Sequence, residues 1–230
     1  MDSRRLSFLP VLLLGLLIAG HCRSLPSGAA KTTSFQLKHD GLSREALLYV
    51  PSGNPGPRPL VIVLHGGSGS PAHMIKLTRG RWNVLADTHQ FLVAYPAGYG
   101  RFWNDHRNDG RSEAHRKNID DVGFLRALIT HLDQKHGVDR RRIFVTGISN
   151  GGFMSLRVAC EMSDLVRAVA AVTAQMPAGS LEKCRPARPV AVLFINGTED
   201  PLVPYEGGVV KVFGRERGQI LSTEESVEFW

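Results

Sequence analysis

The chain has 230 residues, of which 43% are hydrophobic and 21% are charged, and it contains 24 glycines and 13 prolines. This composition is typical of an ordinary soluble domain, and the length suits one domain with a sizeable core. The formal charge is +7, but the basic residues are mostly scattered. Because neither a basic stripe nor a recognisable nucleic-acid-binding module is present, nucleic acid is not an expected partner. The absence of repeats and heptads excludes solenoids and coiled coils.

The N-terminal segment has the pattern of a secretory signal peptide. Arg4 and Arg5 precede the apolar run 6–20, and small and polar residues follow it. The run is too short and too poorly flanked for a comfortable membrane span, so no stable membrane insertion is expected. We therefore predict a signal peptide over 1–24, a linker over 25–33 and secretion of the mature chain. An N-terminal anchor is the weaker alternative.

The three cysteines fit an exported protein. Cys22 belongs to the signal or lies at its edge, and a lipid anchor there is not expected because His21 stands where such signals need a small residue. Cys160 and Cys184 remain as an even pair, which predicts a disulfide; two unpaired thiols are the alternative. No cysteine and histidine cluster has metal-ligand spacing, so no metal or other cofactor is predicted.

The remaining sequence alternates strand patterns with helix patterns. Two alternating runs, 34–39 and 45–50, flank Asp40-Gly41 and predict a tight hairpin. The β-branched run 60–64 predicts a strand that is buried on both faces. Further along, the patterns predict helix 82–89, strand 91–95, helix 118–136, strand 142–146, helix 152–162, strand 168–172 and strand 190–195. Strands that alternate with helices predict a parallel sheet covered on both faces, in the α/β class.

One short segment carries the strongest chemical signal. The residues GISNG at 147–151 have the pattern G-x-S-x-G, follow a predicted strand and open a predicted helix. This context predicts a nucleophile elbow, a sharp turn that exposes the hydroxyl of Ser149 at the carboxyl end of the sheet. The N-terminus of the following helix favours the negative charge that develops there.

A glycine-rich loop, HGGSGS at 65–70, follows the predicted strand 60–64. In the fold that uses such an elbow, one amide of this loop and the amide after the nucleophile stabilise a tetrahedral intermediate. The amides of Gly67 and Asn150 are therefore the predicted oxyanion donors. A phosphate-binding loop is excluded because its lysine and its spacing are missing. We interpret His65 as a structural residue that holds the loop.

The predicted acid is Asp200, in the turn after the last clear strand. The Ser–acid–His chain order of this fold places there a carboxylate that orients a histidine. Gly197 opens the turn and Pro201 fixes it, which favours Asp200. Glu199 is the local alternative, and a purely structural turn residue is the other interpretation of Asp200.

Six stretches together resemble the polyhydroxybutyrate depolymerase and feruloyl esterase-like family of secreted α/β-hydrolases, which is similar to carbohydrate esterase family 1. They are LHGGSGS, WND, NIDDVGFLRALI, DRRRIFVTGISNGGFMS, ACEMSDLVRAVAAVTA and FINGTEDPLVPYEGG. The resemblance covers the predicted domain, 34–230. It implies an α/β-hydrolase fold, with Ser149 as nucleophile, Asp200 as acid, and Gly67 and Asn150 as oxyanion donors. It also implies an ester substrate: a hydroxyalkanoate oligomer, or a feruloyl or acetyl ester of plant polysaccharide.

The segment 97–117 has no periodicity and many polar and aromatic residues, which is typical of a functional loop. By the resemblance, its Trp103-Asn104-Asp105 stretch lies near the mouth of the site. An aromatic residue there is expected to shape the pocket rather than to do chemistry.

The sequence departs from the family in one respect, because the family's histidine follows the acid and none of the nine histidines here lies beyond His136. A serine hydroxyl needs a base within hydrogen-bond reach. We therefore expect impaired activity and a fold that lacks the final strand and the histidine loop. Truncation is the preferred interpretation, a fold that lost its activity is the second, and His65 or His106 as a substitute base is the weakest.

Two other functions are open at this point: a secreted, non-catalytic binding protein with the hydrolase fold, and a serine peptidase of the same fold. The missing final strand and helix should expose apolar surface on the sheet and lower stability. The sequence gives no oligomeric state.

Overall fold

The computed structural model describes residues 31–53 and 56–230. The predicted signal peptide, Cys22 and the first part of the predicted linker lie outside these residues. A seven-stranded sheet has the strand order β1-β2-β4-β3-β5-β6-β7. Its strands are β1 (Lys31–His39), β2 (Leu42–Val50), β3 (Arg58–Leu64), β4 (Leu92–Pro96), β5 (Val138–Ile148), β6 (Ala168–Val172) and β7 (Ala191–Ile195). The β1–β2 and β2–β4 pairs are antiparallel and the remaining pairs are parallel.

The first two strands form the predicted hairpin. Asp40 and Gly41 occupy its turn with φ angles of 47° and 71°. A two-residue turn of this kind needs positive φ at both positions, which Asp-Gly tolerates well. Strand β1 begins at Lys31, so it includes three residues that the sequence analysis assigned to the linker.

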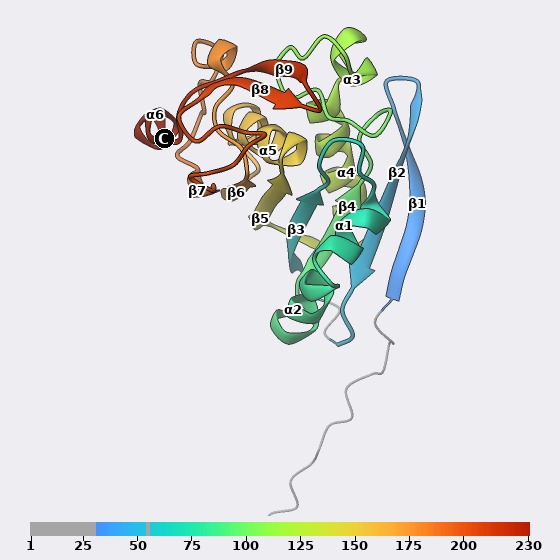
Figure 1. The fold of residues 1–230 in the computed structure, drawn as a ribbon. Helices are drawn as coiled ribbons and strands as arrows, with labels where there is room; N and C mark the ends of the chain where they lie inside the picture. Colours follow the sequence, from blue (N-terminus) through green and yellow to red (C-terminus); the bar gives the residue numbers. More distant parts are fainter. Residues whose placement is uncertain (1–30, 54–55) are drawn as a thin grey trace, which may run out of the picture.

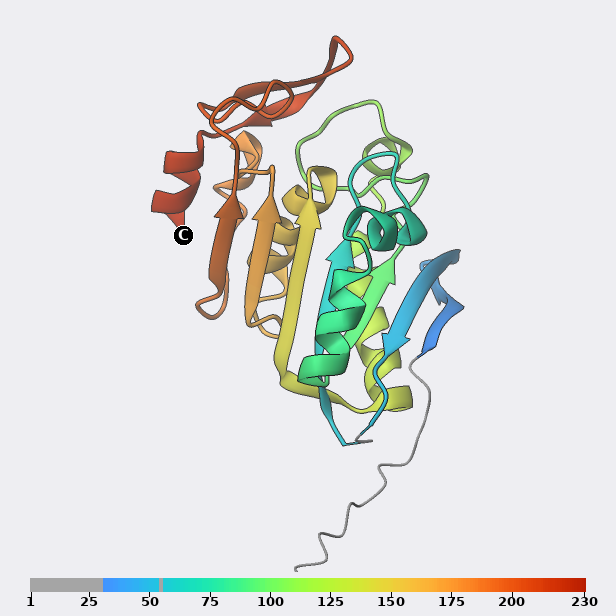
Figure 2. The same ribbon diagram turned by 60° about the horizontal axis from the view of Figure 1, so that its bottom comes forward.

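Helices cover both faces of the sheet (Figures 1 and 2). Helices α1 (Pro71–Leu77) and α2 (Arg81–His89) pack on one face through a small apolar cluster that includes Met74. Helices α4 (Asp121–His136) and α5 (Asn150–Glu161) pack on the other face in the main core. The layers confirm the α/β prediction. Helix α1 was not predicted, although its Ser70 cap and Pro71 start are readable in the sequence.

Several smaller elements surround the carboxyl ends of the strands. They are α3 (Glu113–Arg116), the 3-10 turn Ala178–Ser180, β8 (Gly208–Val212), β9 (Arg215–Ile220) and α6 (Thr223–Phe229). Strands β8 and β9 form a separate hairpin that lies over this end of the sheet (Figure 2). A capping box made by Ser222 and Glu225 starts α6.

One part of the sheet has an uncovered face. Among the described residues β7 is the outer strand, and no helix lies over β5–β7 on the α1–α2 side (Figure 2). Leu193 and Ile195 point to this face and are 55% and 52% exposed. They pair in register with Ala170 and Val172 of β6. This apolar surface agrees with the exposure expected from the sequence.

Cys160 of α5 and Cys184 form the predicted disulfide. The bond closes a loop with a sequence separation of 24 and ties α5 to the segment that follows the 3-10 turn. The prediction of a disulfide is therefore confirmed.

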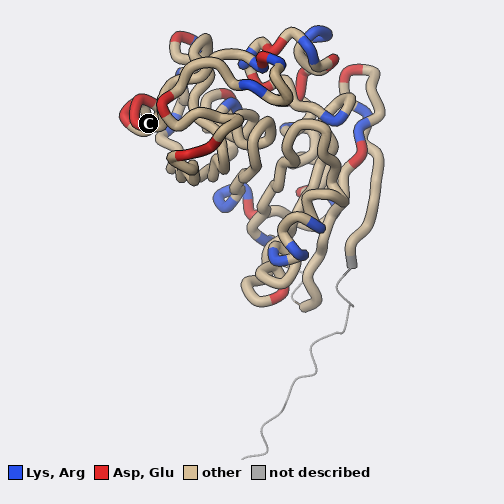
Figure 3. Tube along the Cα trace, viewed as in Figure 1, with Lys and Arg blue, Asp and Glu red and all other residues tan. Residues whose placement is uncertain are grey.

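Residues 31–53 and 56–230 show neither a membrane-spanning helix nor a basic stripe. None of the helices in these ranges combines the length and the apolar character needed to cross a bilayer. Basic and acidic residues are interspersed along the chain instead of forming one basic stripe (Figure 3).

Candidate active site

Ser149 lies at the sharp turn between β5 and α5, as predicted. Its φ and ψ angles are 51° and −121°, a backbone conformation that side-chain-bearing residues rarely adopt. The Ser149 N–H donates to the Val172 carbonyl of the neighbouring strand at 2.8 Å. The turn therefore holds a half-buried hydroxyl at the carboxyl edge of the sheet.

Glycines make this turn possible because the backbone passes very close to its neighbours. A Cβ on Gly151 would lie 2.5 Å from the Leu64 carbonyl oxygen and 2.6 Å from the His65 carbonyl oxygen. A Cβ on Gly147 would collide with the backbone of Gly151. Gly151 is thus needed for packing of the elbow against the end of β3, and Gly147 is needed for the close approach of the backbone within the turn.

The two predicted oxyanion donors both lie beside the elbow. Asn150 is the first residue of α5, and Gly67 lies in the loop after β3. The neighbouring Gly66 is close enough that a Cβ there would be 3.8 Å from the Ser149 Cβ. Within the described part of the chain, neither the Gly67 N–H nor the Asn150 N–H donates to a protein acceptor. Both amides therefore lack a protein acceptor.

His65 has the structural role that the sequence predicted. Its Nδ1–H donates to the Gly66 carbonyl at 2.8 Å, and its Nε2 accepts from the Gly98 N–H at 2.9 Å. Burial lowers the pKa of His65 to about 4. The neutral ring thus joins the glycine loop to the segment 97–117, and both of its nitrogens are occupied.

The interpretation of Trp103 as a residue that shapes the pocket is wrong. Its side chain is fully buried, and its Nε1–H donates to the His65 carbonyl at 2.9 Å. The Asn150 side chain holds the Trp103 backbone from the other side: Oδ1 accepts from the Trp103 N–H at 2.8 Å and Nδ2 donates to its carbonyl at 2.9 Å. An indole with a satisfied N–H is stable in the core, so Trp103 has a structural role: it connects His65 of the glycine-rich loop with Asn150 of α5.

A buried group of charges that sequence reasoning missed lies next to Trp103. We call it the Asp105 cluster, made of Asp105, Arg107, Asp109 and His115. The fully buried Asp105 carboxylate accepts from Asn150 Nδ2 at 2.6 Å, from Arg107 Nη2 at 2.7 Å and from His115 Nε2 at 2.9 Å. The first residue of α5 is therefore bonded directly to the cluster.

His115 bridges the two carboxylates of the cluster. Its Nδ1 lies 2.6 Å from Ser112 Oγ and 3.2 Å from Asp109 Oδ1. Burial alone would lower the pKa of His115, but Asp105 and Asp109 outweigh it and raise this pKa to about 9. Burial would raise the pKa of Asp105, but the Arg107 charge and His115 keep it well below its usual range. At neutral pH two carboxylates thus face one guanidinium and one imidazolium.

His115 and His65 give the free energy of unfolding a defined pH dependence. The folded-state pKa of His115 is raised, so its contribution is full below about pH 6.5 and is lost as pH rises through 9, by about 2 kcal/mol between pH 7 and pH 9. The pKa of His65 is lowered, so stability is also lost as pH falls from 6.5 through 4. Urea unfolding at several pH values should show both limbs. His115→Gln should flatten the alkaline limb, and an unchanged alkaline limb in that variant would contradict the assignment.

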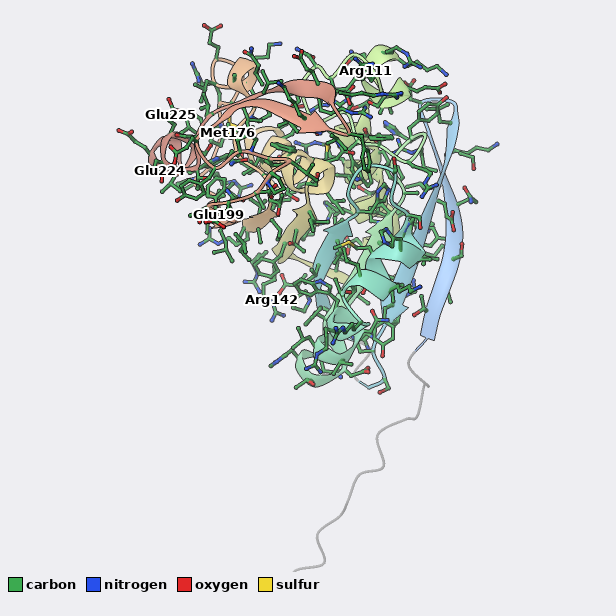
Figure 4. The ribbon with its side chains drawn as sticks, in the orientation of Figure 1. Arg111, Arg142, Met176, Glu199, Glu224 and Glu225 are labelled. Atoms are coloured by element: carbon green, nitrogen blue, oxygen red, sulfur yellow. A yellow bond between two sulfur atoms is a disulfide. The ribbon has the colours of Figure 1, made fainter. Side chains whose placement is uncertain are left out.

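Asp200 lies in the turn after β7, on the same edge of the sheet as Ser149. Ile148, Val172 and Ile195 are aligned across three neighbouring strands, so the two loops start about 10 Å apart. Asp200 Oδ1 accepts from two backbone amides of its own turn, at 2.8 and 3.0 Å. One oxygen of the Asp200 carboxylate therefore stabilises the turn. This is the structural role that the sequence analysis gives as the other interpretation of Asp200. Glu199 is exposed beside it (Figure 4).

Among residues 31–53 and 56–230, no histidine is hydrogen-bonded to Ser149 or Asp200, and His106 instead has its Nε2 3.6 Å from Glu161 Oε1. In the same residues no group of three or more His, Cys, Asp or Glu side chains is arranged to hold a metal ion.

Several known proteins are similar to this chain in sequence. A feruloyl esterase B of Piromyces equi is 29% identical over 81% of this chain and 35% of its own length. A bifunctional acetylxylan esterase/xylanase of Neocallimastix patriciarum is 24% identical over 76% of this chain and 24% of its own length. A poly(3-hydroxyalkanoate) depolymerase C of Paucimonas lemoignei is 29% identical over 59% of this chain and 31% of its own length. The chain thus spans about a quarter to three fifths of the length of the first curated relatives it matches.

Solved structures of esterases support the α/β fold, and a family model matches most of the chain. A thermostable esterase superposes with a TM-score of 0.59 at 22% identity, over 76% of this chain and 48% of that one. A native pOPH structure gives 0.60 at 18% identity, over 89% and 77%. The phospholipase/carboxylesterase family of α/β-hydrolases matches residues 47–212. With its serine elbow, its parallel sheet and this match, the chain belongs to the phospholipase/carboxylesterase family.

Proposed function

We propose that this chain is a secreted serine ester hydrolase with Ser149 as its nucleophile. The observation that carries the proposal is the strained turn of Ser149 beside the two unoccupied amides of Gly67 and Asn150. The Ser149 Oγ attacks the ester carbonyl carbon, and the carbonyl oxygen becomes negative and accepts from the two amides. A general base takes the hydroxyl proton during the attack and returns it to the departing oxygen, so that the alcohol leaves; water then hydrolyses the acyl–serine bond, which releases the carboxylic acid and restores the Ser149 hydroxyl.

The relatives suggest the class of ester. Their names include feruloyl esterase, acetylxylan esterase and poly(3-hydroxyalkanoate) depolymerase. We therefore propose feruloyl or acetyl esters of plant polysaccharide, or hydroxyalkanoate oligomers, as substrates. Secretion is supported by the sequence of 1–24 and by the disulfide between Cys160 and Cys184.

The described residues do not show how the Ser149 hydroxyl would be activated. We propose Asp200 as the acid of the triad, but no described histidine contacts it or Ser149. Without a base in place, turnover falls by roughly 10⁴–10⁶. The same observation favours one alternative, a non-catalytic binding protein that uses the hydrolase cleft.

Covalent labelling separates the two functions. A fluorophosphonate probe should label the chain at Ser149 slowly, and added imidazole should accelerate labelling because it supplies a base that no described histidine provides at Ser149. Ser149→Ala should remove all labelling in both conditions, which controls for the reactivity of imidazole itself. Labelling that persists in Ser149→Ala, or no labelling of the wild type even with imidazole, would contradict the esterase proposal and leave the binding protein.

A further inference from the structure

The two amides of the proposed oxyanion hole come from the loop after β3 and from the start of α5, and one partly buried route of contacts joins them. We propose that the Asp105 cluster together with Arg217 and Phe102 positions Gly67 and Asn150 at the same time. Arg217 belongs to β9, far along the chain, and is a positioning residue because it touches neither Ser149 nor a free amide. The inference rests on the proposed function of the two amides.

The first half of the route starts at Asn150. Its side chain is fixed by three hydrogen bonds, two to the Trp103 backbone and one to Asp105. His115 then connects Asp105 to Asp109, at 2.9 and 3.2 Å. All three ionisable side chains are at most 3% exposed. Because they are shielded from water, these charge-assisted bonds are strong and hold α5 in one position relative to the segment 97–117.

The second half of the route ends at Gly67. Arg217 Nη1 lies 3.5 Å from Asp109 Oδ2, and the Arg217 guanidinium carbon lies 5.7 Å from the centre of the Phe102 ring. The ring in turn presses on Gly67, where a Cβ would be 2.7 Å from Phe102 Cε1. The cation therefore contacts the cluster with one side and the ring that covers the glycine loop with the other.

Two close contacts pack β9 against the segment 97–117, and this segment against α5. A Cβ on Gly218 would collide with the Arg107 carbonyl oxygen, so the backbones of β9 and the segment 97–117 touch. The Arg107 guanidinium carbon also lies 4.0 Å above the ring of Phe153 in α5. The β8–β9 hairpin, the segment 97–117 and the start of α5 are thus packed as one unit.

This arrangement matters because an oxyanion hole works only when both donors are placed together. Donors must be held within about 0.5 Å of the productive position, and loss of one donor costs about 10²–10³ in kcat. A change at Arg217 should therefore reach Asn150, although Asp109, His115 and Asp105 lie between them. A residue that only stabilised β9 would affect its own neighbours alone.

The test is ¹H–¹⁵N NMR of the full chain carrying Arg217→Gln, with Arg217→Lys as the charge-conserving variant. We expect the backbone amides of both Gly67 and Asn150 to shift in Arg217→Gln and to return toward wild type in Arg217→Lys. The matched control is Glu113→Gln, which removes an exposed pair with Lys117 in the same segment and should leave both amides in place. Shifts confined to β8–β9 and Phe102 would overturn the proposal.

A titration of the unmutated chain covers the case in which Arg217→Gln does not fold. The groups that face His115 are Asp105, Asp109 and Ser112 from its own segment, with Arg107 beyond Asp105 and Arg217 beyond Asp109. Raising the pH should move the Gly67 and Asn150 amides together, with a shared midpoint at about 9 that is absent in His115→Gln. Independent midpoints for the two amides would also overturn the proposal.

The rate of fluorophosphonate labelling tests whether the positions of the two amides affect the reaction at Ser149. With imidazole present, Arg217→Gln should label with fluorophosphonate about 10-fold more slowly or worse, while Glu113→Gln stays within about twofold. Equal rates for Arg217→Gln and wild type would overturn the proposal. If the wild type does not label at all, the proposed function fails, but the NMR result still decides whether the two amides are coupled.

Discussion

Asp105→Asn should destabilise the protein by about 4 kcal/mol, although the side chain keeps its size. The substitution removes the carboxylate that faces Arg107 and His115 and leaves a protonated imidazole without half of its compensation. Charges cannot be rehydrated at a site that is fully buried. The amide also cannot accept the Asn150, Arg107 and His115 donors with a charged oxygen. Urea unfolding monitored by tryptophan fluorescence at pH 7 measures the effect.

A surface ion pair is the control for Asp105→Asn. Asp164 accepts two hydrogen bonds from Arg126, at 2.7 and 2.8 Å, but it is 46% exposed. Water replaces such a partner, so Asp164→Asn should cost less than about 1 kcal/mol. A loss of the same small size in Asp105→Asn would mean that His115 is neutral and that the cluster carries no net ionic stabilisation.

The second large effect is expected at Gly151, where alanine should cost about 3 kcal/mol and disable the elbow. The new methyl group would meet the carbonyl oxygens of Leu64 and His65 at 2.5 and 2.6 Å, and neither backbone can move without displacing the end of β3. Thermal unfolding and the rate of fluorophosphonate labelling measure the two consequences. Both should fall, because the strand end and the Ser149 turn shift together.

Gly179→Ala is the matched substitution. Gly179 lies in the 3-10 turn, and a Cβ there would meet nothing within 4 Å. Its melting temperature should stay close to that of the wild type. If Gly151→Ala were equally harmless, the close packing of the elbow against β3 could not be the reason for a glycine at this position.

The parts of the fold that could be predicted are those written in short, local patterns. Asp40-Gly41 between two alternating runs gives the hairpin, and the β-branched run at 60–64 gives a central strand. G-x-S-x-G gives the elbow because the turn itself demands glycines at its flanks. In contrast, β9 (Arg215–Ile220) reads RERGQI, which shows neither alternation nor an apolar run. It is a strand because it pairs with β8 and packs on the segment 97–117.

The candidate site was likewise predictable only where short motifs encode it. Ser149, Asn150 and Gly67 follow from motifs, whereas the partners of Asn150 lie 45 and 47 residues away along the chain. The sequence placed Trp103 correctly in the loop near the site but could not show that its ring points into the core. Polar residues such as His115 and Asp109 look like ordinary loop residues until tertiary contacts bury them. No local signal distinguishes a solvated charge from a buried one.

The backbone conformation of Ser149 lowers the stability of the fold at the residue whose reactivity the proposed function needs. A serine held at φ 51° and ψ −121° costs of the order of 1–3 kcal/mol that a glycine at the same position would largely avoid. The chain therefore gives up part of its folding free energy at the residue that the proposed reaction cannot do without. Any variant selected only for heat resistance will tend to relax this turn, and with it the feature that makes the serine useful.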